Sequence, residues 1–140
     1  MIVLDTNVLS ELMRAEPDPA VMAWMSRQPV PALFTTTVTQ AEILYGLALL
    51  PEGRRRDTLL AAAHAMFEDI FPGRILPFDA EAARAYADIA AQRRREGDPI
   101  SQFDAQIAAV ARSRAATLAT RNTRDFGRCG IALLNPWHGP

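Results

Sequence analysis

Short β-rich segments alternate along the chain with longer segments of helical character. Five of them are predicted to be strands, namely residues 2–4, 33–37, 75–78, 117–119 and 131–134. This alternation is typical of an α/β domain with a mainly parallel central sheet. Such sheets bind ligands beyond the carboxyl ends of their strands, so the residues that follow each strand are candidate functional residues.

The segments between these strands carry helix start and stop signals. Helices are predicted over residues 7–14, 20–26, 39–50, 54–71, 79–96 and 101–114. Asp79 is expected to cap the fifth of them and Gly97 to end it. A chain of 140 residues fits one compact domain better than two. We therefore expect a single domain that spans residues 1–140.

The composition limits the possible functions. The net charge of −1 argues against a broad cationic surface for nucleic acid. All fifteen basic residues are arginine, which indicates either a coding bias with solvated helix ends or bidentate contacts to phosphate. Cys129 is the only cysteine, so a cysteine-based zinc site is excluded and a reduced, cytoplasmic location is favoured. No signal peptide or membrane-spanning segment is predicted.

Asp5 directly follows the predicted strand 2–4, at the point where the chain turns into a helix. A carboxylate at the end of a central strand is costly to bury without a partner, which favours a functional site. Asp5 or Asn7 could instead only cap the following helix. Taken alone, the position of Asp5 favours neither interpretation.

Glu42 and Asp104 each stand three residues after a possible helix cap, in Thr39–Glu42 and Ser101–Asp104. The first sequence matches the T-x-x-E capping box, and for either acid alone a capping role is the better explanation. Both acids, however, begin helices with apolar faces. The first turns of such helices lie beside the carboxyl ends of the strands, so Asp5, Glu42 and Asp104 are predicted to converge.

A fourth candidate lies in the loop after the predicted strand 117–119, where Asp125 follows Asn122. Both residues could simply build a turn. Clustered carboxylates repel one another unless a cation or shared protons compensate. Oxygen ligands without cysteine favour Mg²⁺ or Mn²⁺ over Zn²⁺. An ion of this kind, with its waters, suits hydrolysis of a phosphodiester.

Taken together, these segments resemble the PIN-domain ribonucleases. Within that family the chain resembles the VapC-type toxins of bacterial toxin–antitoxin pairs, especially the FitB-like branch. The resemblance covers the whole chain and rests on the order and spacing of six short segments: IVLDTNVLSE at 2–11, TVTQAEILYGLALLPEGRRR at 37–56, GRILPFDAEAARAYADI at 73–89, ISQFDAQIAA at 100–109, LATRNTRDF at 118–126 and NPW at 135–137.

The resemblance implies a three-layer α/β/α fold and RNA cleavage that depends on Mg²⁺ or Mn²⁺. It matches the family's first three acids to Asp5, Glu42 and Asp104, and the threonine after the first acid to Thr6. The fourth acid varies in placement, and either Asn122 or Asp125 corresponds to it.

The resemblance also implies partners. These are an RNA substrate, a small DNA-binding antitoxin of the VapB type that places a basic side chain among the acids, and homodimers within toxin–antitoxin hetero-oligomers. An apolar surface that could receive the antitoxin is predicted, with the core as the alternative for the same residues: Val21, Met22, Trp24, Met25, Leu44 and Leu47.

Two other functions compete with the ribonuclease. A phosphoryl-transfer domain of the receiver or phosphatase type would share the fold and a strand-end aspartate. Those proteins commonly use a lysine, which this chain lacks, and the phosphatases want an aspartate where Asn7 stands. The second alternative is an interaction module with the PIN fold and no catalysis. A titration with Mn²⁺ separates it from the nuclease.

Overall fold

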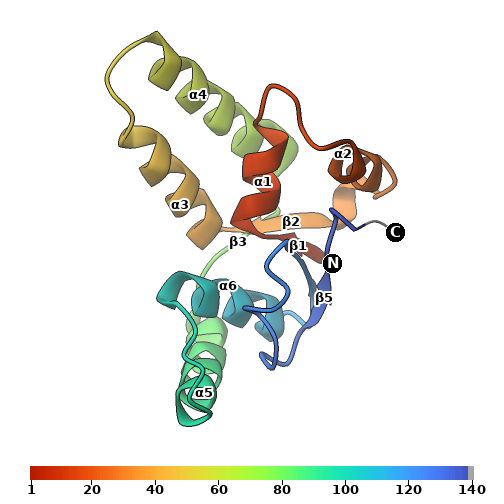
Figure 1. Ribbon diagram of the computed structural model, residues 1–140, viewed down its shortest axis with the longest axis vertical. Coiled ribbons are helices and arrows are strands. Elements are labelled where there is room, and N and C mark those ends of the chain that lie inside the picture. The colour runs from red at the N-terminus through yellow and green to blue at the C-terminus, as the bar shows by residue number, and fades with distance from the viewer. Residues whose placement is uncertain (139–140) are drawn as a thin grey trace.

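The computed structural model describes residues 1–138, and its central feature is a parallel sheet between two groups of helices (Figure 1). Within these residues the sheet has the strand order β3-β2-β1-β4-β5, and every neighbouring pair is parallel. The strands are β1 (Ile2–Leu4), β2 (Leu33–Thr36), β3 (Ile75–Leu76), β4 (Thr117–Ala119) and β5 (Ala132–Leu134). The predicted parallel α/β fold is confirmed.

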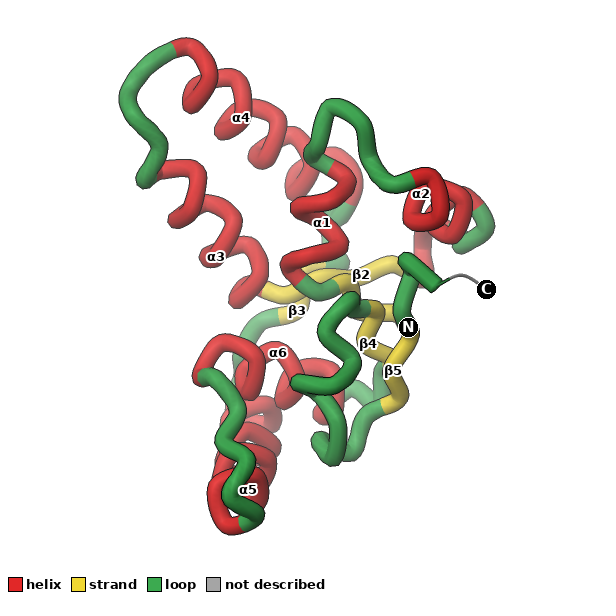
Figure 2. Tube along the Cα trace, in the orientation of Figure 1, coloured by secondary structure: helices red, strands yellow, loops and turns green. Residues whose placement is uncertain are grey.

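The helices form two layers, one on each side of the sheet (Figures 1 and 2). The first layer holds α1 (Thr6–Leu12), α2 (Pro19–Ser26), α3 (Thr37–Ala48) and α4 (Arg54–Ala65). The second holds α5 (Ala80–Arg95) and α6 (Gln102–Ser113), which pack closely together. A short 3₁₀ helix, η1 (Val30–Ala32), leads into β2. The architecture is the expected three-layer α/β/α arrangement.

Successive residues of the central strands face opposite layers, because side chains alternate along a strand. Leu4 and Ala119 belong to the apolar cluster under α1–α4, whereas Val3 and Leu118 belong to the cluster under α5 and α6. All four are completely buried. Burial on both faces explains why β1 is an uninterrupted apolar run rather than an alternation of polar and apolar residues.

The strand order reverses at β1, since β2 and β3 lie on one side of it and β4 and β5 on the other. Open α/β sheets bind their ligands at such a reversal, outside the carboxyl ends of the strands. Leu4 is in register with Ala119, so the residues after β1 and β4 leave the sheet side by side. Asp5 and Thr120 therefore meet at this point.

The structure corrects two local predictions. Helix α3 begins at Thr37 rather than Thr39, and its N-cap is Thr36, whose hydroxyl accepts a hydrogen bond from the Thr39 amide. Glu42 consequently lies in the second turn, and the predicted capping box between Thr39 and Glu42 does not form. The stretch 54–71 is not one α-helix either, because α4 ends at Ala65 and continues as the π-helical segment η2 (Met66–Ile70). No helix within residues 1–138 is long and apolar enough to cross a membrane.

Candidate active site

Asp5 is held in place between the ends of β1 and β4. Its Oδ1 accepts a hydrogen bond of 2.8 Å from the Thr6 amide, and its Oδ2 accepts one of 2.8 Å from the Thr120 hydroxyl. The side chain is almost completely buried, with 3% of the residue exposed. Within residues 1–138 it takes part in no ion pair. A buried carboxylate with no cationic partner is the unusual feature of this site.

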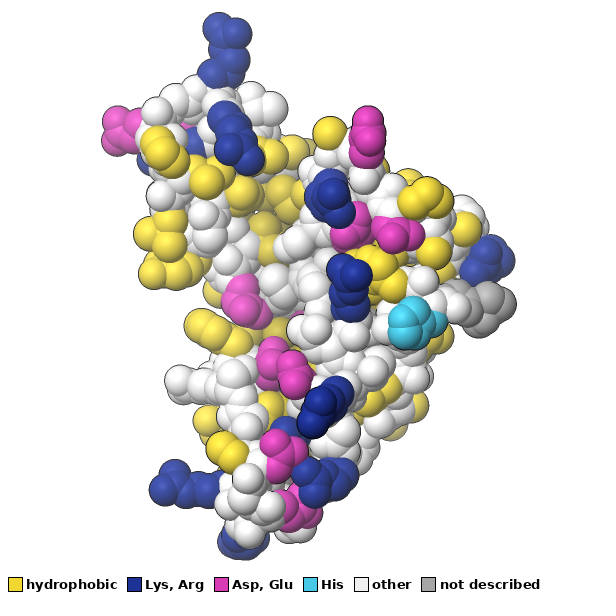
Figure 3. Space-filling view, in the orientation of Figure 1, with side chains coloured by type: hydrophobic (Ala, Val, Ile, Leu, Met, Phe, Trp, Pro, Cys, Tyr) yellow, Lys and Arg dark blue, Asp and Glu magenta, His cyan; other side chains and the backbone are white. Residues whose placement is uncertain are grey.

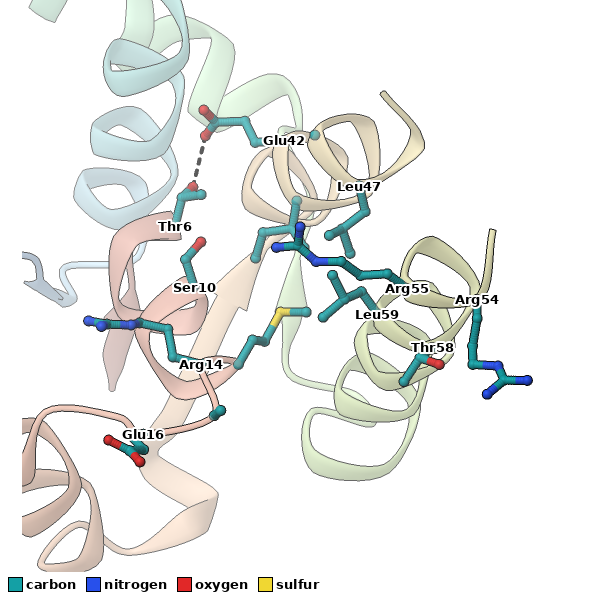
Figure 4. Close-up of a pocket in the computed structure, with 14 residues that line it drawn as sticks. Thr6, Ser10, Arg14, Glu16, Glu42, Leu47, Arg54, Arg55, Thr58 and Leu59 are labelled. Carbon is teal, nitrogen blue, oxygen red and sulfur yellow. Dashed lines mark hydrogen bonds between the residues drawn. The ribbon is translucent and has the colours of Figure 1, made fainter. Parts of the chain in front are cut away.

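Glu42 reaches the same region from α3 and is oriented by Thr6. The Thr6 hydroxyl donates to Glu42 Oε1 at 2.8 Å (Figure 4). It also lies 3.1 Å from the Thr39 hydroxyl. A hydroxyl carries one proton, so Thr39, which is completely buried, donates to Thr6 in turn. This chain of two hydroxyls fixes the carboxylate of Glu42 without neutralising it.

Asp104 comes from the opposite helical layer, in the first turn of α6. The Asp104 amide donates to Ser101 Oγ at 3.2 Å, so Ser101 caps this helix as predicted. The Ser101 hydroxyl also forms a side-chain hydrogen bond with the Asp104 carboxylate, which lowers the pKa of that group. The carboxylate is half-buried and lines the pocket described below.

These three acids line one pocket of about 530 Å³, as the sequence predicted. Asn122 also lines it, whereas Asp125 is exposed and is not part of its wall. Acidic side chains and arginines gather along the middle of this face of the molecule, between the two helical regions (Figure 3). The convergence joins segments that are far apart in the chain, because Asp5 precedes its hydrogen-bond partner Thr120 by 115 residues.

Burial and mutual repulsion raise the pKa values of the three carboxyl groups. Burial raises the pKa of Asp5 from 3.8 to about 6, the charges of Asp104 and Glu42 add to the increase, and the hydrogen bonds from Thr120 and Thr6 oppose it. The pKa of Glu42 is raised by burial and by the charge of Asp104. Burial and the charge of Asp125 raise the pKa of Asp104, so Asp125 influences the site electrostatically. The pocket favours either protons or a bound cation.

The chemistry of the donors fits a hard divalent cation. The acids offer oxygen ligands, and Cys129, the only sulfur ligand of the thiolate type, is buried elsewhere in the cluster under α5 and α6. Within the described part of the chain, no three His, Cys, Asp or Glu side chains stand close enough together to hold one ion jointly. Mg²⁺ suits this spacing, because it is usually held by one or two carboxylates and keeps several waters.

Sequence reasoning did not identify five further residues of the pocket wall: Ser10, Glu11, Arg14, Arg121 and Trp137. Glu11 is buried, and its carboxylate accepts hydrogen bonds from Arg14 and from the Asp18 amide. Trp137 also packs against the apolar cluster under α1–α4. The strand-end rule that selected Asp5 could also have selected Arg121 after β4 and Trp137 after β5.

A larger groove of about 1160 Å³ adjoins the acidic pocket and shares Thr6, Ser10, Arg14 and Glu42 with it. It lies between α1, α3 and α4, and Arg55 extends from α4 into it, whereas Arg54 points away (Figure 4). Its apolar walls are formed mainly by Met13, Ile43, Leu47 and Leu59.

The apolar surface predicted for a partner does not form as a whole, and the alternative of a core role holds for two of its residues. Val21 and Trp24 are core residues, with 0% and 2% of their surface exposed. Of the six residues that were predicted to form it, Leu47 lines the groove. The remaining apolar residues of α2 project elsewhere because α2 packs on α1 at the far side of the layer from α4.

Comparison with known proteins decides the family, because the model of the PIN domain matches residues 2–131. The chain belongs to the PIN-domain family. It is similar over 98% of its length to the VapC ribonuclease Y4jK of Sinorhizobium fredii, at 44% identity over 137 residues that make up 98% of that protein. Toxin FitB of Neisseria gonorrhoeae is 38% identical over 138 residues, which cover 99% of each chain.

A solved structure of FitAB bound to an IR36 DNA fragment contains a chain of the same fold. Its TM-score is 0.93 at 38% identity, with 100% of this chain and 98% of that chain covered. The resemblance to PIN domains of the VapC and FitB type is thereby confirmed. The PIN-domain fold also removes the reason for considering a receiver or phosphatase domain.

Proposed function

We propose that this PIN domain is an endoribonuclease that depends on Mg²⁺ or Mn²⁺. The observation that carries the proposal is the convergence of Asp5, Glu42 and Asp104 in one pocket at the sheet's strand-order reversal. The names of the relatives, a VapC ribonuclease and a FitB toxin, support RNA as the substrate and toxicity as the outcome. The alternative is a PIN-fold module without catalysis. It would not explain why Asp5 is buried without a cationic partner.

Asp5 and Asp104 are the residues that would hold the ion. Asp5 is immobilised by two hydrogen bonds, and Asp104 faces it from the other helical layer. Asn122 lines the same pocket, and Asp125 adds negative charge near Asp104. Either residue can therefore bind the ion indirectly, through one of its water ligands. The chemistry that such an ion supplies is Lewis-acid activation of a phosphodiester toward water.

Glu42 is placed to accept the proton of the attacking water. The raised pKa of Glu42 makes its carboxylate a stronger base, closer to what proton abstraction at neutral pH needs. Thr6 fixes one oxygen of this carboxylate, and the other oxygen stays free. Thr6 acts as a positioning residue, because it touches Glu42 rather than the reacting atoms. Hydrolysis then delivers the hydroxyl of water to phosphorus and releases the ribose oxygen as the leaving group.

RNA cleavage by the purified chain tests this proposal. We expect cleavage of RNA in Mn²⁺ or Mg²⁺ and none in EDTA. Asp5→Asn and Asp104→Asn should each abolish cleavage while the chain still melts cooperatively. Arg84→Gln, which changes an exposed arginine on α5 away from the pocket, is the matched control. Cleavage by Asp104→Asn at the rate of the wild type would exclude the assigned site.

We further propose that the large groove receives an antitoxin of the VapB type, which is a DNA-binding protein. The structural relative FitAB is a complex bound to DNA, and the groove here combines apolar walls with direct access to the acids. A basic side chain delivered through the shared wall would bind the carboxylates and exclude the cation. Homodimers and toxin–antitoxin hetero-oligomers, with the RNA target in the cytoplasm, belong to the same proposal.

The groove assignment makes a separate prediction about the partner. Leu59→Glu should weaken binding of the protein encoded beside this chain by at least about ten-fold, because a charge would enter an apolar contact. RNA cleavage should remain at the level of the wild type, since Leu59 lines the groove but not the acidic pocket. Unchanged binding of a folded Leu59→Glu variant would place the partner elsewhere.

A further inference from the structure

Arg121 and Trp137 form a pair at the rim of the acidic pocket. Arg121 follows β4 and Trp137 follows β5, and these strands are adjacent and parallel, so both residues emerge at the same edge of the sheet. The guanidinium carbon of Arg121 lies 5.1 Å from the centre of the Trp137 ring. Both side chains line the pocket that contains Asp5, Glu42 and Asp104.

The backbone that carries Arg121 is anchored to the acidic site. The Arg121 amide donates to Asn7 Oδ1 at 3.3 Å, and the preceding residue, Thr120, donates its hydroxyl proton to Asp5. The Trp137 amide donates to Asn135 Oδ1 at 2.9 Å in a local turn. The backbone at Arg121 is therefore fixed relative to Asp5, and the Trp137 ring lies against its guanidinium.

Arg121 has no role in the fold that would account for its position. It is exposed, and within residues 1–138 it forms no ion pair, although acids line the same pocket. A guanidinium that lies against an aromatic ring keeps its N–H donors free at its edge, where they can bind a phosphate in two places. Trp137 contacts the apolar cluster under α1–α4 and is nevertheless only partly buried.

We propose that Arg121 and Trp137 form a nucleotide subsite that binds unpaired RNA beside the acids. Arg121 binds a phosphate next to the one that is cleaved. The outer face of its guanidinium, which the Trp137 ring supports from the other side, stacks on the base of that nucleotide. The inference rests on the proposed ribonuclease function and specifies its substrate as single-stranded RNA. Stacking on a guanidinium supported by an aromatic ring requires a base that is not already stacked in a duplex.

The subsite also compensates for the charge of the pocket. Three carboxylates repel the phosphates of RNA, and the chain has no lysine that could attract them. The positive charge of Arg121 beside the acids reduces the repulsion between the carboxylates and the RNA backbone. Stacking adds affinity that does not depend on charge or on base identity, so the subsite selects for single strands rather than for a sequence.

The test measures RNA binding separately from cleavage. The parent protein is the full chain carrying Asp5→Asn, studied in EDTA so that no cleavage occurs. The probes are a short fluorescein-labelled single-stranded RNA and the same RNA annealed to its complement. Affinity is measured by fluorescence anisotropy over a range of salt concentrations, and each variant is checked by thermal melting.

We expect Trp137→Leu to weaken binding of the single strand by at least about ten-fold, and Trp137→Phe to keep affinity within about three-fold, because phenylalanine still stacks. The phenylalanine variant remains informative if leucine impairs folding. RNA should also quench the protein's tryptophan fluorescence, and this quenching should disappear in Trp137→Phe, where the buried Trp24 is the remaining tryptophan.

Arg121→Gln should weaken binding by about ten-fold and flatten the slope of log affinity against log salt by roughly 0.7, the value for one phosphate contact on a single strand. Arg124→Gln is the matched control, because Arg124 is an exposed arginine of the same loop that does not line the pocket. It should change affinity by less than about two-fold. The duplex should bind more weakly and should not respond to Trp137→Leu.

Equal affinities of Trp137→Leu and the parent, or equal losses in Arg121→Gln and Arg124→Gln, would overturn the inference. A parent protein that does not bind the single strand would also overturn it. These failures differ from failure of the proposed function, which is absence of metal-dependent cleavage by the wild-type chain. Cleavage without the expected binding losses would leave the nuclease in place and remove the subsite.

Discussion

Replacing Asp5 with asparagine should stabilise the metal-free chain at neutral pH. The pKa of Asp5 is raised from 3.8 to about 6 by burial and by the neighbouring acids, so the folded state prefers the protonated form. At about 1.4 kcal/mol per pKa unit, keeping this carboxylate ionised in the folded state costs roughly 3 kcal/mol. Asparagine removes that cost because its amide carries no charge.

The gain is partly offset by hydrogen bonding. Asp5 accepts from both the Thr6 amide and the Thr120 hydroxyl, and an amide group offers only one acceptor oxygen. Losing one such bond costs about 1–2 kcal/mol. The expected net stabilisation of Asp5→Asn in EDTA at pH 7.5 is therefore about 1–2 kcal/mol, which for a domain of this size raises Tm by about 3–8 °C.

The effect should depend on pH in a defined direction. A folded-state pKa above the unfolded value means that the folded chain binds more protons between pH 4 and 6, so its stability falls as pH rises through this window. Well below pH 4 Asp5 is protonated in both the folded and the unfolded state, so its ionisation no longer destabilises the wild type. The difference between Asp5→Asn and the wild type should thus grow from its smallest value at pH 4 to its full value above pH 7.

Thermal and urea denaturation in EDTA at pH 4 and pH 7.5 measure this difference. Adding Mn²⁺ at pH 7.5 should then reverse the order, because an ion at 100 times its Kd stabilises the wild type by about 2.7 kcal/mol and the variant has lost a ligand. A difference between the two proteins that does not change with pH would refute the assigned electrostatics of Asp5. So would an equal response of both proteins to Mn²⁺.

Three further substitutions probe the site and its support. Glu42→Gln should keep the stability of the wild type, because glutamine still accepts a hydrogen bond from Thr6. It should reduce RNA cleavage at least about 100-fold, which is the scale of general-base catalysis. Full activity would remove Glu42 from the catalytic residues. Asp104→Asn should leave the α6 cap intact, because Ser101 accepts from the backbone, and a Tm well below that of the wild type would show a structural role instead. Arg93→Ala should destabilise the chain by about 2–4 kcal/mol in urea denaturation, because buried Arg93 donates to the carbonyls of Asp98, Asp125 and Gly127; a loss below about 1 kcal/mol would contradict that role.

The fold was largely predictable because its signals are local. The short β-rich segments at 2–4 and 117–119 define β1 and β4 with correct ends, and Asp79 and Ser101 cap α5 and α6 as expected. The start of α3 was not predictable in the same way. Thr36, Thr37 and Thr39 are all acceptable caps, and tertiary packing selects Thr36 by burying Thr39 against Thr6.

The site was predictable only in part, because its geometry depends on contacts between distant segments. The strand-end rule correctly brought Asp5, Glu42 and Asp104 together. It could not show that Glu11 turns into the pocket, or that Trp24 is core while Leu59 lines the groove, since these outcomes depend on how α1, α2 and α4 pack. Likewise, no local signal pairs Arg121 with Trp137 across β4 and β5.

Calorimetric titration of Mn²⁺ into the wild-type chain and Asp5→Asn tests the central claim, that the acidic pocket is a cation site. The wild type should bind saturably at pH 7.5 and Asp5→Asn should not. At pH 6 binding to the wild type should release close to half a proton from Asp5, visible as a dependence of the heat on the buffer's ionisation enthalpy. Absence of saturable binding to the wild type, or equal binding by Asp5→Asn, would contradict the account.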